Sequence, residues 1–303
     1  MDRTKTIAAL VLVPVLMLML MLMLMLITTG CSTTSPAIKV GSKNFTEQVL
    51  LGEIIAQHLE HRLHQKVERR LNLGGTLLAH QALLAGELDL YPEYTGTALS
   101  AVLKEPIQND TDAVLKRVKA EYQRKFQVAW FDPLGINNSF AMVVRGDVAR
   151  AQHLETLSDA AKAPKWALGV GYEFEQRADG LAALNAAYHL PWAGSAKNMD
   201  LGLLYKALEL KQVSMIAANQ TDGLLSKMDL KTLDDDQHAF PPYQLCIAVR
   251  EDALRKTSQL PAALQELSGA FTNTKMRELN FQVDGRHRPV AEVAAEFLKG
   301  IEK

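Results

Sequence analysis

The sequence of 303 residues is poor in cysteine, and its positive and negative charges nearly cancel. Its two cysteines, Cys31 and Cys246, are too few for a disulfide framework or a cysteine-rich metal site. The histidines also lack Cys or Glu partners at the spacing of metal ligands. Thirty-three Lys and Arg against 34 Asp and Glu leave a net charge of −1, so no overall basic field attracts nucleic acid. We therefore expect no metal, no cofactor and no nucleic-acid partner.

Sequence motifs of catalysis are missing as well. The chain contains no G-x-S-x-G elbow, no S-x-x-K followed by K-T-G, and no H-E-x-x-H. It also lacks the G-x-G-x-x-G and Walker patterns that bind nucleotides. The acidic run 234–236 is typical of a solvated turn rather than of a cation site. These absences predict that the protein is not an enzyme.

One long hydrophobic run is present near the start of the sequence. It extends from Ile7 to Ile27, follows a short basic segment, and precedes Gly30 and Cys31. This junction resembles the processing site of bacterial lipoproteins, in which the cysteine receives the lipid. We therefore expect a signal peptide over 1–30, lipidation of Cys31 and a polar tether over 31–36. An uncleaved membrane anchor and simple secretion are the alternatives, and each places the rest of the chain outside the cytoplasm.

After Pro36, short apolar segments alternate with longer amphipathic ones. The first pair is a strand over 38–40 and a helix whose apolar residues recur at helical spacing between Val49 and Leu63. Further strands are expected at 67–73, 88–91, 140–144, 166–170, 213–217 and 245–249. Further helices are expected at 110–126, 177–188, 201–210 and 290–301. The alternation predicts an α/β fold.

Two polar clusters follow predicted strands. In the first, Asn44 and Glu47 have the spacing of a helix N-cap, and Lys43 precedes them. The free N–H groups of a helix start and a neighbouring lysine favour an anion, although a plain cap with a solvated lysine is the alternative. The second cluster, residues 89–97, carries two tyrosines and two threonines. Its rings either contact a ligand or fill the core.

Six motifs together carry a resemblance to a known family. In chain order they are Lys39–Gln48, Asp89–Thr97, Gly135–Phe140, Glu173–Gly180, Thr221–Gly223 and Phe240–Tyr243. They resemble the substrate-binding proteins of ABC importers for glycine betaine, choline and related osmoprotectants. The resemblance implies a type II periplasmic-binding-protein fold, in which two α/β lobes close around a small ligand in the cleft between them. A lipid anchor would then hold the binder close to its permease.

The ligand chemistry of this family explains which side chains it needs. A trimethylammonium group has no N–H donor, so aromatic rings bind it, whereas a carboxylate needs Arg, Lys and hydroxyl donors. The resemblance implies that the four ring positions are occupied by Tyr94, Phe140, Asn219 and Tyr243. It implies that the anion is held by Lys43, Thr97 and Arg177.

Two of these positions depart from the family pattern. Phe140 keeps a ring but lacks the hydroxyl of the usual tyrosine, and Asn219 lacks the ring altogether. Because each ring over a desolvated cation contributes roughly 0.5 to 2 kcal/mol, the loss of one weakens binding about tenfold or more. Asn219 and Asn138 could instead bind a polar group that betaine lacks. The alternatives are therefore another zwitterion, such as ergothioneine or an amino-acid-like solute, and a sensory lipoprotein of the same fold.

These expectations combine into one organisation. Residues 37–139 and 244–303 are expected to form the first lobe, and residues 140–243 the second. We expect an exported, lipid-anchored protein on the periplasmic or cell-surface side of a membrane. It is expected to capture a small quaternary-ammonium or zwitterionic solute and deliver it to the permease subunits of an ABC transporter.

Overall fold

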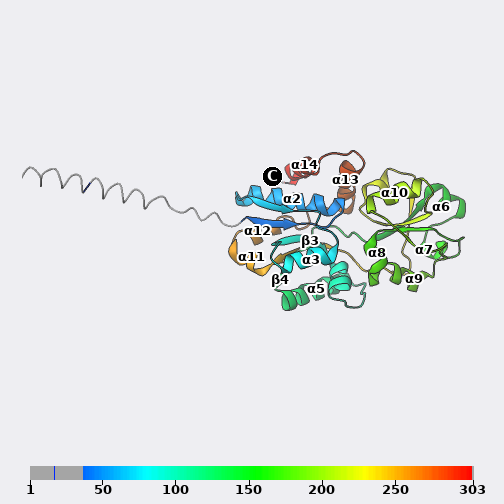
Figure 1. Cartoon of the computed structure of the whole chain (residues 1–303), viewed down its shortest axis with the longest axis horizontal. Coiled ribbons are helices and arrows are strands. Elements are labelled where there is room, and N and C mark those ends of the chain that lie inside the picture. Colours follow the sequence, from blue (N-terminus) through cyan, green and yellow to red (C-terminus); the bar gives the residue numbers. More distant parts are fainter. Residues whose placement is uncertain (1–16, 18–36, 302–303) are drawn as a thin grey trace, which may run out of the picture. The chain divides into compact units, whose positions relative to one another are not determined.

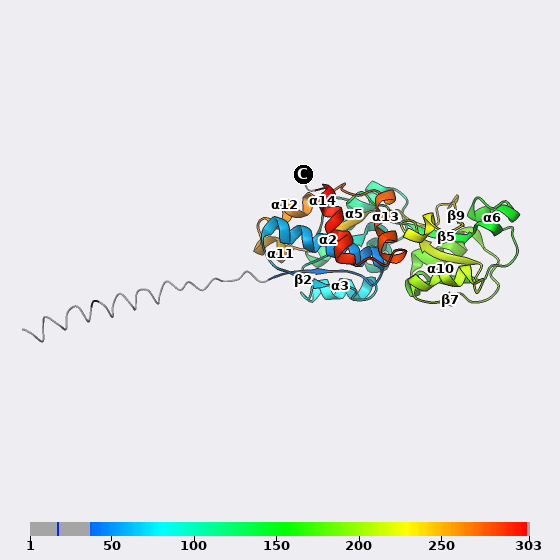
Figure 2. The ribbon, with the colours of Figure 1, turned by 90° about the horizontal axis from the view of Figure 1, so that it is seen from above.

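The structure is a computed structural model that describes Met17 and residues 37–301. Apart from Met17, the predicted signal peptide lies outside the described residues, and so do Cys31 and the whole tether. Residues 38–301 belong to one compact unit with mixed α/β structure, as the alternating sequence pattern predicts. Figures 1 and 2 show its strands in two separate lobes.

Each lobe is built on a five-stranded sheet. The first sheet has the order β2 (Val67–Arg70), β1 (Ile38–Gly41), β3 (Leu90–Tyr94), β10 (Leu245–Arg250) and β4 (Val128–Trp130). The second has the order β7 (Lys197–Asn198), β6 (Leu168–Val170), β8 (Met215–Asn219), β5 (Phe140–Arg145) and β9 (Leu230–Leu233). In each sheet, four strands run in one direction and the fourth in order, β10 or β5, runs antiparallel to both of its neighbours.

The helices lie around these two sheets. Those of the first lobe are α2 (Thr46–Leu63), α3 (Thr76–Leu84), α4 (Thr95–Thr97), α5 (Thr111–Phe126), α11 (Glu251–Lys256), α12 (Leu260–Gln265), α13 (Asn273–Asp284) and α14 (Val290–Ile301). Those of the second are α6 (Gly146–Gln152), α7 (Leu157–Ala160), α8 (Tyr172–Gln176), α9 (Ala183–Tyr188) and α10 (Leu201–Glu209). Single turns of tighter or wider helix lie at Ala98–Val102, Ala178–Ala182 and Gly223–Ser226.

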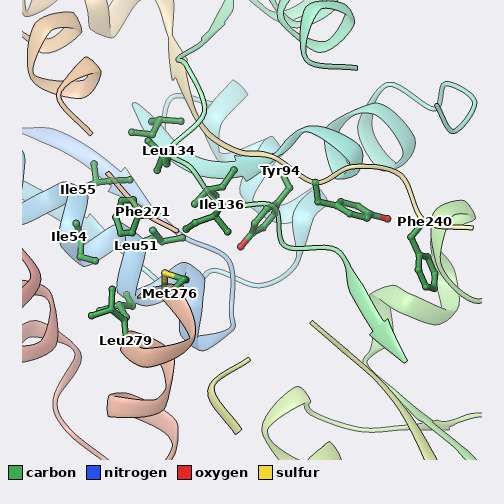
Figure 3. Packing of buried hydrophobic residues seen from close by; sticks show 14 of the residues in the cluster. Leu51, Ile54, Ile55, Tyr94, Leu134, Ile136, Phe240, Phe271, Met276 and Leu279 are labelled. Carbon is green, nitrogen blue, oxygen red and sulfur yellow. The ribbon is translucent and has the colours of Figure 1, made fainter. Parts of the chain in front are cut away.

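The apolar face of α2 packs in the hydrophobic core of the first lobe. Leu51, Ile54 and Ile55 are buried from this face, and Figure 3 shows them beside Phe271 and the side chains of α13. The C-terminal helices α12, α13 and α14 all pack on α2, the first helix after residue 37. Burial of each such aliphatic side chain contributes about 1.5 to 3 kcal/mol relative to exposure.

The start of α2 differs from its prediction. The helix begins at Thr46 with Phe45 as its N-cap residue, and no side chain caps it. Asn44 is therefore not the N-cap, and its backbone N–H donates instead to Gly74 O at 3.0 Å. Glu47 does not complete a capping box because its carboxylate binds Tyr94 and Asn138.

The helix predicted over 177–188 is broken in the structure. Helix α8 ends at Gln176, Arg177 is extended (φ −79°, ψ 143°), and α9 begins only at Ala183. Gly180 lies so close to the preceding turn that a Cβ there would approach Phe174 O to 2.0 Å. The break turns the Arg177 side chain towards Asp179 and Thr97 instead of along a helix surface.

Candidate functional site

A cavity of about 340 Å³ is lined by residues of both lobes. The structure places all eight residues that were predicted to contact a ligand on its wall: Lys43, Tyr94, Thr97, Asn138, Phe140, Arg177, Asn219 and Tyr243. Four of them lie at or next to the ends of strands. Tyr94 and Asn219 end β3 and β8, whereas Phe140 begins the antiparallel strand β5 and Tyr243 precedes the antiparallel strand β10. Because β5 and β10 run antiparallel to β8 and β3, the starts of β5 and β10 lie at the same cleft as the ends of β8 and β3.

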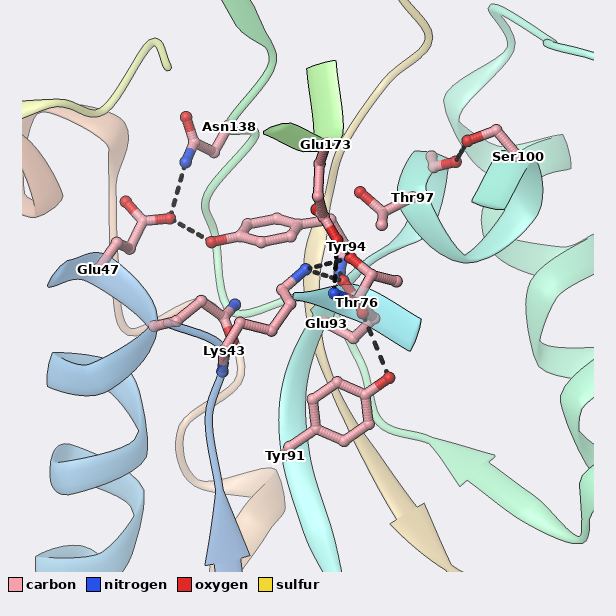
Figure 4. Close-up of polar contacts among 12 residues, drawn as sticks. Lys43, Glu47, Thr76, Tyr91, Glu93, Tyr94, Thr97, Ser100, Asn138 and Glu173 are labelled. Atoms are coloured by element: carbon pink, nitrogen blue, oxygen red, sulfur yellow. Dashed lines mark hydrogen bonds and ion pairs between the residues drawn. The ribbon is translucent and has the colours of Figure 1, made fainter. Parts of the chain in front are cut away.

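Lys43 lies in the turn between β1 and α2, and only 2% of its side chain is exposed. Its Nζ forms an ion pair with Glu93 Oε1 at 2.6 Å and donates to Thr76 Oγ1 at 3.4 Å (Figure 4). The same Nζ lies 4.8 Å from the centre of the Tyr94 ring. Because an ammonium group has three donors and two are used here, Lys43 retains one N–H for a ligand in the cavity.

Arg177 reaches the cavity from the broken segment after α8. Its Nε and Nη2 bind both oxygens of Asp179, at 2.9 and 2.5 Å, and Nη2 also donates to Thr97 Oγ1 at 3.1 Å. Burial would lower the pKa of Arg177, but Asp179 holds it above its usual value. Burial would likewise raise the pKa of Asp179, but the Arg177 guanidinium holds it below its usual range. The guanidinium therefore stays charged. Among the described residues its Nη1 makes no hydrogen bond, although it lies 3.6 Å from Glu173 Oε2 as an ion pair.

Aromatic rings form much of the remaining wall. Arg177 Cζ lies 5.2 Å from the centre of the Phe140 ring and 5.8 Å from that of Tyr243. The Tyr243 hydroxyl donates to Asp179 at 2.7 Å, which fixes the ring beside the guanidinium. Burial, together with the nearby Asp179, raises the pKa of Tyr243 well above 10, so its hydroxyl stays protonated.

Three further rings that were not among the predicted residues line the cavity: Phe45, Tyr172 and Phe174. Phe45 stacks on Tyr94 with ring centres 6.4 Å apart, and Phe174 packs edge-on against Phe140 at 4.8 Å. Both belong to motifs that the sequence analysis quoted, so the signal was present there. They were missed because a phenylalanine in a motif is as often part of a core as of a pocket.

Asn138 belongs to a buried hydrogen-bond network. It lies in the first passage between the sheets, the segment that connects β4 of the first sheet to β5 of the second. Its Nδ2 donates to Glu47 Oε1 at 2.9 Å, and its Oδ1 accepts from the Thr221 backbone N–H at 3.2 Å. Glu47 also accepts the Tyr94 hydroxyl at 2.6 Å (Figure 4) and the Asn280 amide at 3.1 Å. Each end of the Asn138 amide is thus used once within the protein, which leaves one N–H and one lone pair of the oxygen.

Asn219 forms the side of the cavity that has no ring. Its backbone N–H and its Nδ2 donate to the two oxygens of Asp222, at 3.1 and 3.3 Å. Burial raises the pKa of Asp222 to about 6. Asn219 Oδ1 has no partner among the described residues, and Asn219 also lines a second cavity of about 540 Å³. The position therefore offers a ligand one hydrogen-bond acceptor and space around it.

The described residues form neither a metal site nor a membrane-spanning helix. In the part of the chain that the structure describes, no cluster of His, Cys, Asp or Glu has the arrangement of a metal site. None of the helices between residues 37 and 301 combines the length and apolar character needed to cross a bilayer. Cys246 is buried in β10, as its apolar strand predicts.

The known proteins that this chain resembles are binding proteins of transport systems. The profile described as the substrate binding domain of ABC-type glycine betaine transport systems matches residues 36–300. The carnitine transport binding protein OpuCC of Listeria monocytogenes is 33% identical over 270 residues, which cover 88% of this chain and 87% of the relative. The ergothioneine transport permease/ergothioneine binding protein EgtU of Helicobacter pylori is also 33% identical, over 86% of this chain and 47% of its own length.

A solved structure matches as well. The crystal structure of a glycine betaine/carnitine/choline ABC transporter protein is 31% identical and superimposes with a TM-score of 0.73. The match covers 87% of this chain and 98% of that structure. The predicted fold class of two α/β lobes is confirmed by this likeness, and so is the predicted family.

Proposed function

Because the chain belongs to the family of substrate-binding domains of ABC-type glycine betaine transport systems, we propose that its cleft binds a betaine-type zwitterion through the eight residues predicted from the sequence. The protein is a substrate-binding protein for osmoprotectant import of the glycine betaine/carnitine type. Such proteins act outside the cytoplasm and deliver small ligands to permeases. The family is one of transport proteins rather than of enzymes.

One observation carries the choice of ligand class. The Arg177 guanidinium, whose Nη1 makes an ion pair with Glu173 but no hydrogen bond within the described residues, lies 5.2 and 5.8 Å from two ring centres in the same cavity. A short betaine carries its carboxylate and its trimethylammonium group only a few bonds apart. We assign the carboxylate to Arg177, Lys43 and Thr97, since they supply charged and hydroxyl donors. The ammonium then lies against Tyr94, Phe140 and Tyr243, whose rings attract a cation that cannot hydrogen-bond.

A thermal-shift screen tests this assignment. A ligand that binds the folded protein at 100 times its dissociation constant adds about 2.7 kcal/mol of stability, which raises the unfolding midpoint. We expect glycine betaine and carnitine to raise the midpoint, and choline to raise it less because choline lacks the carboxylate. A midpoint that responds to ordinary amino acids but to no trimethylammonium compound would contradict the proposal.

The missing ring at position 219 gives a specific prediction. Replacing Asn219 by Tyr should strengthen glycine betaine binding by about 0.5 to 2 kcal/mol, because a further π-face then contacts the cation. The cavities on its two sides leave room for the larger side chain. Titration calorimetry measures the change, with Asn198→Tyr, an exposed position on β7, as the matched control. Equal affinities of parent and Asn219→Tyr would remove this position from the site.

A second candidate ligand has its own supporting observation. The free acceptor Asn219 Oδ1 suits a betaine whose side group carries an N–H or O–H donor, and one relative at 33% identity is an ergothioneine binding protein. For such a cargo, Asn219→Tyr should reduce affinity, because it removes the hydrogen-bond partner. The sign of the change therefore distinguishes the two ligands when glycine betaine and ergothioneine are titrated in parallel.

We also assign the N-terminal segment to membrane attachment. Cys31 follows an apolar run and Gly30, and a lipid on Cys31 would hold the binding lobes close to the permease. Replacing Cys31 by Ser should stop lipid attachment and leave the protein either unprocessed or released from the membrane. Metabolic labelling with a radioactive fatty acid, followed by fractionation, measures both effects. Cys246→Ser, a change in the buried strand β10, should leave labelling intact.

The lobe boundaries are part of the same proposal. Residues 37–139 and 244–303 form one body, and residues 140–243 the other, so that closure occurs at the two passages between them. The sheet membership of β5 and β10 supports this division, since each strand begins next to a proposed passage.

A further inference from the structure

Helix α3 begins without a cap of its own. Its N-cap residue is Gly75, which has no side chain to accept a hydrogen bond from the first N–H groups of the helix. In the structure, Glu173 of α8, on the other lobe, takes this role. Its Oε1 accepts from the Thr76 backbone N–H at 2.6 Å, and its Oε2 accepts from Thr76 Oγ1 at 3.1 Å. A helix start in the first lobe is thus capped by the second lobe.

Gly75 makes this approach possible. A Cβ at Gly75 would lie 2.5 Å from Glu173 Oε1, which is closer than real Cβ contacts. The backbone of Gly75 (φ −78°, ψ −176°) is one that alanine also adopts without strain. The conflict would therefore fall on the Glu173 carboxylate and not on the conformation of the loop.

The same carboxylate is connected to both cations of the cavity. Thr76 Oγ1, which binds Glu173, is also the second partner of Lys43 Nζ (Figure 4). On the other side, Arg177 Nη1 lies 3.6 Å from Glu173 Oε2. Burial would raise the pKa of Glu173, but Lys43, Arg177 and Thr76 together lower it, so the group is ionised at neutral pH. Glu173 therefore lies between the two proposed contacts of the ligand carboxylate.

The geometry points to Glu173 as a positioning residue that latches the two lobes together, by capping α3 across the cleft and holding Thr76 and Lys43 in place for the ligand. This inference rests on the proposed function only for its link to the ligand. The latch itself is a contact within the protein, and it can be measured without any ligand.

Site-resolved hydrogen exchange on the full-length protein tests the latch. In Glu173→Gln and in Gly75→Ala, the Thr76 amide should exchange about tenfold faster than in the parent, because its charged acceptor is weakened or displaced. Glu175→Gln is the matched control, since Glu175 lies on the same helix but binds Asn198 within its own lobe. We expect Glu175→Gln to leave Thr76 exchange unchanged.

Calorimetry then tests the link to the ligand. With glycine betaine as the probe, both latch variants should bind about tenfold more weakly than the parent, with most of the change in the dissociation rate. Unchanged Thr76 exchange in both Glu173→Gln and Gly75→Ala would overturn the latch. Faster exchange with unchanged affinity would overturn its positioning role, whereas a parent that binds no betaine would contradict the proposed function and leave the exchange result valid.

Discussion

Replacing Arg177 by Ala should reduce the affinity for a betaine by about 30-fold to several thousandfold. The variant removes the charged donor assigned to the ligand carboxylate, and losses of such buried charge pairs cost about 2 to 5 kcal/mol. It also leaves Asp179, which is fully buried, with the Tyr243 hydroxyl as its main remaining partner. The repulsion between this carboxylate and that of the ligand adds to the loss. Titration calorimetry with glycine betaine and with carnitine measures it.

Arg177→Lys separates charge from geometry. A lysine keeps the positive charge next to Asp179, but it cannot bind both Asp179 oxygens with a planar fork. We expect this variant to fold with an unfolding midpoint close to that of the parent and still to bind at least tenfold more weakly. Affinity equal to the parent in Arg177→Ala would mean that the ligand anion is bound elsewhere.

Replacing Lys43 by Met should lower the free energy of unfolding by about 3 to 5 kcal/mol. The side chains of Lys43 and Glu93 are 2% and 0% exposed, so the variant leaves a buried carboxylate without its counter-ion. Glu93 would keep only the hydrogen bonds from the Tyr94 backbone N–H and from the Tyr91 hydroxyl. Urea unfolding followed by circular dichroism measures the change in stability.

The double variant Lys43→Met with Glu93→Gln distinguishes folding from binding. It removes both charges at once, so most of the lost stability should return. Betaine affinity should stay low, because the N–H that Lys43 keeps for the ligand is still absent. If the double variant regained both stability and affinity, Lys43 would have a purely structural role.

Much of the fold could be predicted because local patterns determine it. The helical spacing of apolar residues between Val49 and Leu63 predicts α2, and short apolar segments predict both antiparallel strands, β5 and β10. The break at Arg177 could not be predicted in this way. The sequence around it has helical character, but in the structure Arg177 is extended and its side chain binds Asp179 and Thr97. A contact such as that with Thr97, 80 residues away, cannot be read from local sequence preference.

The residues of the cavity could likewise be predicted only in part. Its predicted residues came from motifs that can be read along the chain. Their partners could not be read, because Lys43 and Glu93 are 50 residues apart and Thr76 and Glu173 are 97 apart. No spacing rule connects residues at such separations before the fold is known. The prediction thus found Lys43 and Arg177 but missed the contacts of Glu93 with Lys43 and of Glu173 with Thr76.

A crystal structure of the protein grown with glycine betaine, and a second with carnitine, tests the central claim most directly. The proposed site predicts ligand density in the cleft, with the trimethylammonium group against the rings of Tyr94, Phe140 and Tyr243. The carboxylate should lie within hydrogen-bond distance of Arg177 and Lys43. Ligand bound with its ammonium group away from these rings, or an empty cleft at saturating concentrations of both compounds, would contradict it.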